Sequence, residues 1–281
     1  MNVLWFGFGK FGLPMAQKLM DSGHKVFFPE EFRESPTVRS AFRSGVSNYK
    51  TTRHIDILAL CLPKGRDSEQ VIRHLISKSV LPQIILDFGT VAPGESQQLA
   101  TLARTNGSQY VDCPISGDIE KARHGKLTIY AGCPEAEQVS VVLNDLGENI
   151  FYFDTQSLGA CAKHINQYLH LSNLALVGQA FAVAGSLGLE LPKLYEALMR
   201  SSSYSNMLER FGPDYINNDF DCRFSISNAR KDAGQVISML QEQNVTDPIF
   251  EHVHKKLMDS ALNDVTNMNF SLAFLKSLDR E

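Results

Sequence analysis

The stretch Gly7-Phe8-Gly9-Lys10-Phe11-Gly12 decides the fold of this 281-residue chain. It follows an apolar run at residues 3–6 and leads into a helical pattern. In such a GxGxxG turn the first glycine permits a tight turn, the second lets the backbone approach a pyrophosphate, and the third allows close helix-strand packing. The helix then offers free N–H groups to the anion. The stretch predicts a dinucleotide-binding Rossmann domain, with a plain glycine turn as the alternative.

The first half of the sequence continues this alternation of strands and helices. Strand-like runs occur at residues 3–6, 25–28, 57–62, 84–87, 109–112 and 127–131. Helical patterns lie between them, at residues 14–22, 67–77, 94–105 and 135–146. Several strand-like runs are apolar almost throughout, which is typical of parallel strands covered by helices on both faces. We therefore predict an α/β fold with a doubly wound, mainly parallel sheet.

The strand signal ends near residue 153, and the rest of the chain has helical patterns. Helices are expected within residues 164–189, 192–200, 227–243, 248–262 and 270–278. This shift predicts a Rossmann domain over residues 1–156 and an all-α domain over residues 157–281, led by a long helix.

The long helix contains no Asp, Glu, Lys or Arg from residue 164 to residue 189. A run of that length could span a bilayer. Its polar residues would each be costly in lipid, and they are His164, Asn166, Gln167, His170, Asn173 and Gln179. We therefore expect no membrane span, but a helix of about 40 Å that is buried in protein along most of its length.

The overall composition is that of an ordinary globular protein. The chain has 27 basic and 31 acidic residues, a formal charge of −4, and 43% hydrophobic residues. These values exclude a disordered chain and argue against a nucleic-acid binder, which needs a basic surface. The odd number of cysteines, none in CxxC spacing, predicts neither a disulfide framework nor a metal site. The N-terminal residues show no signal peptide, and we expect a cytoplasmic protein.

An acidic residue is expected about 20 positions after the glycine turn, where it binds the adenosine ribose. Glu30 occupies that place. A carboxylate there repels a 2′-phosphate, which favours NAD over NADP. Glu31 and Arg33 leave two alternatives open: a pair of solvated glutamates, and an arginine that contacts the phosphate of NADP.

The glycine turn, extended to Ala16, resembles the N-terminal signature of the β-hydroxyacid dehydrogenases. This family includes 3-hydroxyisobutyrate dehydrogenase, tartronate semialdehyde reductase and, more distantly, 6-phosphogluconate dehydrogenase. Further segments resemble the family pattern in chain order, and together the matches span residues 3–232. They are Leu62-Pro63, Asp87-Phe88-Gly89-Thr90, Asp112-Cys113-Pro114-Ile115-Ser116-Gly117, residues 125–129, Gly159 with Lys163 and Asn166, and Lys231-Asp232.

The resemblance implies hydride transfer between a nicotinamide and a carbon that carries a hydroxyl or oxo group, in a small β-hydroxyacid. Lys163 would be the general acid/base. A lysine at the start of a long buried helix, with no carboxylate near it in sequence, favours the neutral amine that a base needs. The alternative is a surface lysine.

The resemblance also implies the residues that hold the two ligands. The substrate would be bound by Ser116, Gly117, Asp118, Asn166 and Gln167. The cofactor, NAD or NADP, would be bound by Gly7, Phe8, Gly9, Lys10, Phe11, Gly12, Glu30, Leu62, Pro63, Thr90 and Lys231. The alternative for Lys231 is a charge paired with Asp232, and for Phe8 and Phe11 it is packing. Family members generally pair through the helical domain, so a homodimer or larger homo-oligomer is implied.

The sequence departs from the family pattern at four positions. Asp118 and Ser157 replace glycines, Gly89 replaces a serine and Gln167 replaces an asparagine. A carboxylate at residue 118 would repel an anionic substrate, so we hypothesise a substrate that carries an amino or other cationic group.

Two further readings of the whole chain remain open. One is an imine reductase of the same architecture, although those relatives usually carry Asp or Tyr in place of Lys163. The other is a dinucleotide-binding module without catalysis, although such members tend to lose the lysine.

Overall fold

The structure is a computed structural model that describes residues 1–29, 36–43, 45–49, 54–220 and 224–259, together with Asn263 and Ala273. The chain forms two compact units, Met1–Lys163 and His164–Glu281. The division lies inside a long helix, α7 (Leu158–Ser186). The domain boundary at residue 156 stays a prediction.

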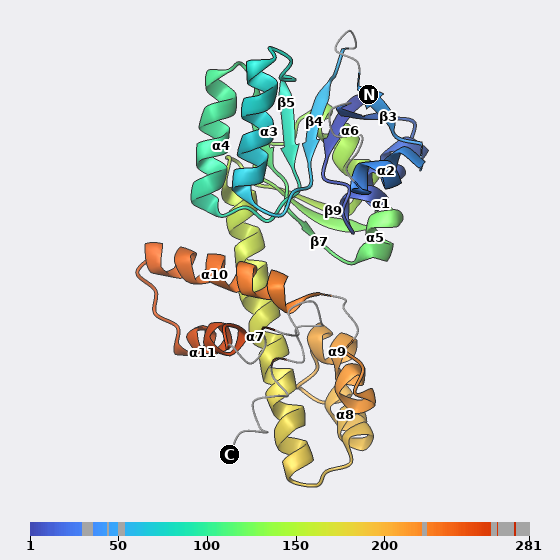
Figure 1. Cartoon of the computed structure of the whole chain (residues 1–281). Coiled ribbons are helices and arrows are strands. Elements are labelled where there is room, and N and C mark those ends of the chain that lie inside the picture. The colour runs from blue at the N-terminus through green and yellow to red at the C-terminus, as the bar shows by residue number, and fades with distance from the viewer. Residues whose placement is uncertain are drawn as a thin grey trace. The chain divides into compact units, whose positions relative to one another are not determined.

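The first unit is built on a six-stranded parallel sheet (Figure 1). Its strands are β1 (Asn2–Phe6), β2 (Lys25–Pro29), β3 (Ser47–Tyr49), β4 (Ile57–Leu60), β5 (Ile84–Asp87) and β6 (Gln109–Asp112). Their order is β3-β2-β1-β4-β5-β6, and each neighbouring pair is parallel. The predicted doubly wound sheet is confirmed. β3 was not predicted, because three residues are too short for a periodic signal.

Helices cover both faces of this sheet because successive residues of each strand point to opposite sides. In β1, Val3 and Trp5 join one apolar cluster, and Leu4 and Phe6 join another. The first cluster includes residues of α1 (Gly12–Asp21), α2 (Pro36–Arg43) and α6 (Glu137–Leu146). The second includes residues of α3 (Gly65–Ser77) and α4 (Pro93–Thr105). Continuous apolar strands are therefore buried on both faces, as their sequences predict.

A second, three-stranded sheet completes this unit. It contains β7 (Ile115–Ser116), β8 (Leu127–Ala131) and β9 (Gly147–Tyr152), with α5 (Ile119–Arg123) between the first two. β7 is antiparallel to β8, and β9 is parallel to it. The strand predicted at residues 127–131 is present, but it lies in this second sheet and not in the six-stranded one. β8 alternates buried and partly exposed residues, which is the pattern of a strand with one covered face.

The second unit is helical in the part that the structure describes, as predicted. α7 is followed by α8 (Leu191–Met199), α9 (Asn206–Asn217), α10 (Ile226–Glu242) and α11 (Pro248–Leu257). Their apolar side chains form one cluster that includes Leu174, Phe181, Phe211 and Phe250. α9 was not predicted, and the helix expected at residues 270–278 lies outside the described residues except for Ala273.

The long helix α7 has 29 residues, or about 43 Å at 1.5 Å per residue. It begins at Leu158, before the chargeless run. Most residues of α7 are buried or partly buried, as expected, but one face carries exposed apolar side chains such as Leu169 and Leu176, 54% and 56% exposed. Among the described residues, no helix combines the length and hydropathy that crossing a membrane requires.

Candidate active site

The glycine turn between β1 and α1 is shaped by close backbone contacts. Gly7 has a φ of +96°, and a Cβ on it would lie 2.2 Å from the carbonyl oxygen of Cys61. A Cβ on Gly12 would lie 1.8 Å from the carbonyl oxygen of Gly7, whereas one on Gly9 would have no atom within 4 Å. The first turn of α1 carries no acidic side chain. A tight turn that opens at Gly9 before a helix N-terminus fits the phosphates of a dinucleotide.

A cavity of about 500 Å³ adjoins this turn. It lies at the carboxyl ends of β1, β2 and β4, where ligands bind in doubly wound sheets because the strand order reverses there. Its lining includes the predicted residues Gly7, Phe8 and Leu62. The residues that the sequence did not predict are Trp5, Phe6, Phe28, Pro29, Val38, Asp67, Gln70, Val71 and His74.

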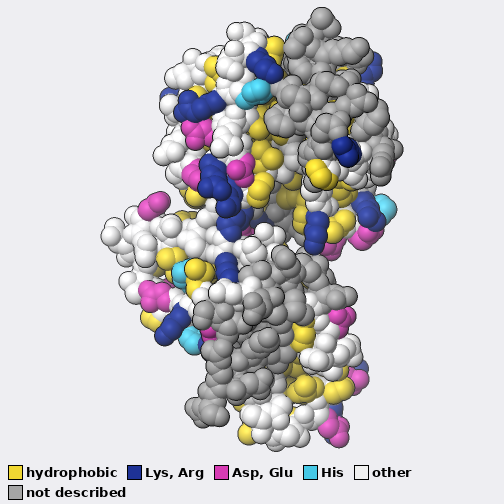
Figure 2. Space-filling model, viewed as in Figure 1, with side chains coloured by type: hydrophobic (Ala, Val, Ile, Leu, Met, Phe, Trp, Pro, Cys, Tyr) yellow, Lys and Arg dark blue, Asp and Glu magenta, His cyan; other side chains and the backbone are white. Residues whose placement is uncertain are grey.

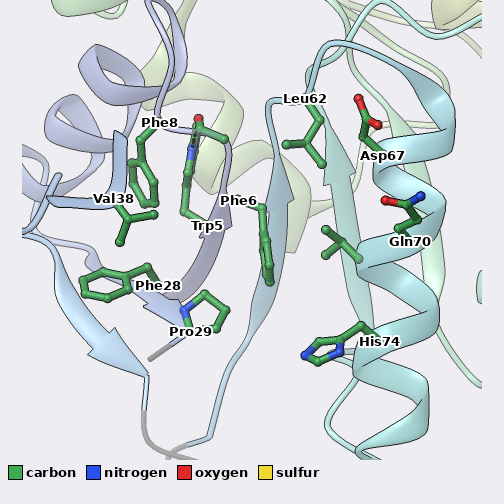
Figure 3. Close-up of a pocket in the computed structure, with 12 residues that line it drawn as sticks. Trp5, Phe6, Phe8, Phe28, Pro29, Val38, Leu62, Asp67, Gln70 and His74 are labelled. Carbon is green, nitrogen blue, oxygen red and sulfur yellow. Dashed lines mark hydrogen bonds between the residues drawn. The ribbon is translucent and has the colours of Figure 1, made fainter. Parts of the chain in front are cut away.

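The cavity has an aromatic side and a polar side (Figure 3). Figure 3 shows Asp67, Gln70 and His74 along α3, across from the rings of Trp5 and Phe28. The three polar residues follow helical spacing, and in the sequence they are indistinguishable from a solvated helix face. Only the fold places them beside the glycine turn.

Trp5 connects the cavity to the glycine turn and to the residue that follows β5. Its indole N–H donates to the carbonyl oxygen of Gly7 at 3.0 Å, and its ring stacks on Phe88 with 5.7 Å between centroids. It is the only tryptophan of the chain. Its fluorescence therefore reports on occupancy of this cavity.

The other predicted cofactor residues lie outside this cavity's lining. Lys10 and Pro63 are exposed, and Thr90 is half-buried. Phe11 packs against the core, which agrees with the alternative that it has a packing role. Glu30 lies outside the described residues.

The turn that carries Thr90 is held by Asp87, a fully buried carboxyl group at the end of β5. Asp87 accepts hydrogen bonds from the Gly89 N–H at 2.9 Å and the Tyr110 hydroxyl at 3.1 Å. Burial raises the pKa of this carboxyl group above its ordinary value. A Cβ on Gly89 would lie 2.7 Å from the carbonyl oxygen of Leu62. This close approach explains why the chain has glycine where the family pattern has serine.

The first turn of α7 is fixed by the strand ends of the first unit. Asp112 accepts hydrogen bonds from the N–H groups of Ser157 and Ala160 at 2.8 and 2.6 Å. A Cβ on Gly159 would lie 2.3 Å from the carbonyl oxygen of Tyr130, so only glycine fits there. Lys163 follows one turn later and is 7% exposed.

Ser157, which stands where the family pattern has glycine, has a φ of +72°. A side chain in this left-handed region costs about 1 kcal/mol. A glycine, as in the family pattern, would avoid this cost.

The pH dependence of stability should report on Asp112. Burial raises the pKa of this carboxyl from 3.8 to about 6, although its two N–H donors lower it. A raised folded-state pKa stabilises the fold below pH 4, and this contribution is lost as the pH rises through 6. Asp112→Asn removes the titration, so its free energy of unfolding relative to wild type should rise by about 2 kcal/mol between pH 4 and 7. Denaturant titrations at several pH values measure this difference, and a constant difference would contradict the assignment.

The predicted substrate residues fall into two groups. Ser116 and Gly117 lie at the end of β7, and Asp118 caps α5 by accepting a hydrogen bond from the Lys121 N–H at 2.9 Å. The capping bond gives Asp118 a structural reason for its presence, beside the hypothesis of a cationic substrate.

The other group lies in the helical unit. Asn166 donates to Gln167 at 3.0 Å, and Gln167 donates to Asp232 at 2.6 Å. Lys231 was predicted to bind the cofactor, with an ion pair to Asp232 as the alternative. The structure shows this ion pair, with 3.1 Å between Nζ of Lys231 and Oδ1 of Asp232.

Two family profiles match the chain and together cover most of it. The profile described as the NAD-binding domain of 6-phosphogluconate dehydrogenase matches residues 2–153. The profile described as the NAD-binding domain of NADP-dependent 3-hydroxyisobutyrate dehydrogenase matches residues 158–275.

Among curated proteins, 2-(hydroxymethyl)glutarate dehydrogenase of Eubacterium barkeri is 28% identical to this chain over 89% of this chain and 85% of its own length. The 2-hydroxy-3-oxopropionate reductase of Escherichia coli is also 28% identical, over 83% and 82%.

Solved structures show the same fold. The 3-hydroxyisobutyrate dehydrogenase of Mycobacterium tuberculosis with L-serine has a TM-score of 0.86 at 21% identity, covering 98% of both chains. Psf3 in complex with NADP+ and 2-OPP has a TM-score of 0.82 at 19% identity, covering 99% of this chain and all of the other. An imine reductase of Streptomyces aurantiacus is less similar, with a TM-score of 0.62 at 16% identity over the whole of both chains. The matched profiles, with the glycine turn and the doubly wound sheet, show that the chain belongs to the β-hydroxyacid dehydrogenase family of NAD(P)-dependent oxidoreductases.

Proposed function

We propose that this protein transfers a hydride between a nicotinamide dinucleotide and a small β-hydroxyacid or its oxo form, with Lys163 as general acid/base. The observation that carries the proposal is the placement of Lys163, a 7%-exposed lysine one turn into a helix whose start is fixed by Asp112 and Gly159. Burying a lysine is costly, and a fixed helix start that does so favours a functional role over a surface charge.

Different parts of the protein bind the cofactor, transfer the proton and hold the substrate. The glycine turn and the N-terminus of α1 hold the dinucleotide phosphates, and the cavity beside α3 holds its adenosine half. The bound nicotinamide supplies the hydride acceptor or donor. In alcohol oxidation, the Lys163 amine removes the hydroxyl proton, and in reduction its ammonium returns a proton to the developing alkoxide. Ser116, Gly117 and Asn166 bind the substrate, and Gln167 orients the side chain of Asn166.

A substrate screen tests the proposal. The wild-type protein is incubated with 3-hydroxypropanoate, 3-hydroxyisobutanoate, 3-hydroxybutanoate and glycerate, each with NAD+ and NADP+, and reduced dinucleotide is followed by absorbance. Turnover with at least one acid is expected. Dinucleotide binding without turnover on any hydroxyacid would instead support a binding module, and turnover of cyclic imines alone would support an imine reductase.

We propose NAD as the preferred cofactor, because the carboxylate of Glu30 follows β2 at the position that binds the ribose hydroxyls. The ratio of kcat/KM for the two dinucleotides measures this preference directly. We also infer a cytoplasmic location, which agrees with the free thiols of the four described cysteines.

We propose that the protein is a homodimer that pairs through a mainly apolar stripe on α7. The stripe consists of Ile165, Leu169, Asn173, Leu176, Ala180 and Val183, which are all exposed. Figure 2 shows hydrophobic side chains at the surface of the helical unit. Their spacing of three and four residues is that of a helix-helix seam. A second copy suits the stripe, because residues 164–189 carry no charge that its own copy would repel.

Leu176→Glu is expected to convert the dimer to a monomer at micromolar concentration, since two buried carboxylates would face each other across a symmetric seam. Light scattering after size-exclusion chromatography measures the mass. Ile249→Glu, an equally drastic change at a 63%-exposed position on α11, should leave the mass unchanged. A wild-type monomer would contradict the proposal.

A further inference from the structure

A chain of four polar side chains joins α7 to α10 inside the helical unit. Nδ2 of Asn166 donates to Oε1 of Gln167, and Nε2 of Gln167 donates to Oδ2 of Asp232. Nζ of Lys231 lies 3.1 Å from the other oxygen of that carboxylate. Gln167 and Asp232 are each only 4% exposed, so water hardly competes for these bonds.

Asp232 determines the direction of the whole chain, because an ionised carboxylate only accepts hydrogen bonds. Gln167 must therefore turn its NH2 group toward Asp232, which leaves its carbonyl oxygen for Asn166. Asn166 then donates its NH2 group to Gln167, and its own carbonyl oxygen points away from Gln167. One buried carboxylate, held by Lys231, thus fixes the orientation of two amides.

We propose that Asp232 is a positioning residue which, through Gln167, makes Asn166 present a hydrogen-bond acceptor to the substrate. The inference rests on the proposed function, in which Asn166 binds the substrate one helical turn after Lys163. The group that Asn166 selects is then a donor, such as the hydroxyl of a hydroxyacid or an ammonium. An oxo group only accepts, and it forms no hydrogen bond with a carbonyl oxygen.

This role also explains a departure from the family pattern. Gln167 stands where the pattern has asparagine, and its additional methylene extends the amide toward α10. The 2.6 Å bond to Asp232 depends on that length.

Asp232→Asn is the direct test, because it keeps the shape and removes the obligate acceptor. The Lys231 ammonium attracts the carbonyl oxygen of the new asparagine, whose NH2 group then faces Gln167. The side-chain amides of Gln167 and Asn166 must then both rotate by half a turn, and Asn166 presents its NH2 group to the substrate instead. We expect the preference for a hydroxyl ligand over its oxo analogue to fall about tenfold, the effect of one mispaired hydrogen bond.

The measurement uses 3-hydroxybutanoate and 3-oxobutanoate, which differ little in size and charge. Dissociation constants are obtained by calorimetry in unreactive complexes, the hydroxyacid with reduced and the oxoacid with oxidised dinucleotide. The ratio of the two constants is compared between variant and wild type. A change that only loosened the fold would weaken both ligands alike and leave the ratio unaltered.

Two further variants complete the experiment. Asp247→Asn alters another link from α7, which is partly buried and leads to Tyr168 and the start of α11, and its ratio should equal that of wild type. Gln167→Met keeps the chain length but removes both hydrogen bonds, so Asn166 can turn either way and the ratio should fall about threefold. It serves in place of Asp232→Asn if that variant does not fold.

The inference is overturned if Asp232→Asn and Gln167→Met both keep the ratio within about twofold of wild type. It is also overturned if wild type binds neither ligand. Failure of the proposed function is a separate result, namely ligand binding by wild type without turnover of any hydroxyacid. Binding and turnover thus distinguish the two.

Discussion

Lys163→Ala is expected to lower kcat for the hydroxyacid by about 10³-fold, because general acid/base catalysis contributes about 10²–10⁴-fold. Dinucleotide affinity should stay within about twofold, since Lys163 lies on α7 and not on the glycine turn or the cavity lining. The start of α7 stays fixed by Asp112 and Gly159, so the variant should remain folded.

Three readouts separate catalysis from structure in this variant. Quenching of Trp5 fluorescence measures dinucleotide binding, and steady-state rates measure kcat. Added methylamine should restore part of kcat, because a small amine can take the place of the missing one. Lys163→Met keeps the volume of the side chain and should be equally slow, whereas Lys193→Ala, at an exposed position of α8, should behave as wild type. A kcat within tenfold of wild type for Lys163→Ala would contradict the role of this residue.

Gly12→Ala should abolish measurable dinucleotide binding, with a loss of affinity of at least about 100-fold. The new Cβ would lie 1.8 Å from the carbonyl oxygen of Gly7, which is backbone and cannot turn aside. Either α1 or the turn must move, and both hold the phosphates. Overpacking of this kind costs about 3 kcal/mol of stability, which thermal or denaturant unfolding will show.

Gly9→Ala separates ligand approach from folding. A Cβ on Gly9 meets no atom within 4 Å, so stability should stay within about 0.5 kcal/mol of wild type. Affinity for the dinucleotide should nevertheless fall about tenfold or more, because the backbone at the second glycine approaches the pyrophosphate. Gly94→Ala, an equally open position in α4, is the matched control and should leave the affinity unchanged. Unchanged affinity in Gly9→Ala would contradict the placement of the phosphates.

Much of the fold follows from local pattern. The runs at residues 57–62 and 84–87 are apolar throughout or nearly so, and both are central strands buried on two faces. Short elements were missed: β7 has two residues, and α5 has five. Such segments are held by tertiary contacts, and their own sequences carry too few periods to be recognised.

The candidate site was predicted unevenly. The glycines, the proline and the lysine of the site could be identified from the sequence because each residue type has a distinctive property. That property is backbone freedom for glycine, a fixed φ for proline and a titratable amine for lysine. The cavity residues Gln70 and His74 and the positioning residue Asp232 have ordinary polar side chains, which acquire a role only from what the fold places beside them.

The sequence by itself determined the phosphate turn, the doubly wound sheet and the lysine at the start of a long chargeless helix. These features depend on backbone freedom, alternation and charge, which are properties of neighbouring residues. Only the tertiary structure decided that the cavity lies between the turn and α3, that one face of α7 is exposed, and that Asp232 orients Gln167. Each of these joins residues distant in sequence, such as Gln167 and Asp232, and the free energy of such contacts depends on distances that no local pattern contains.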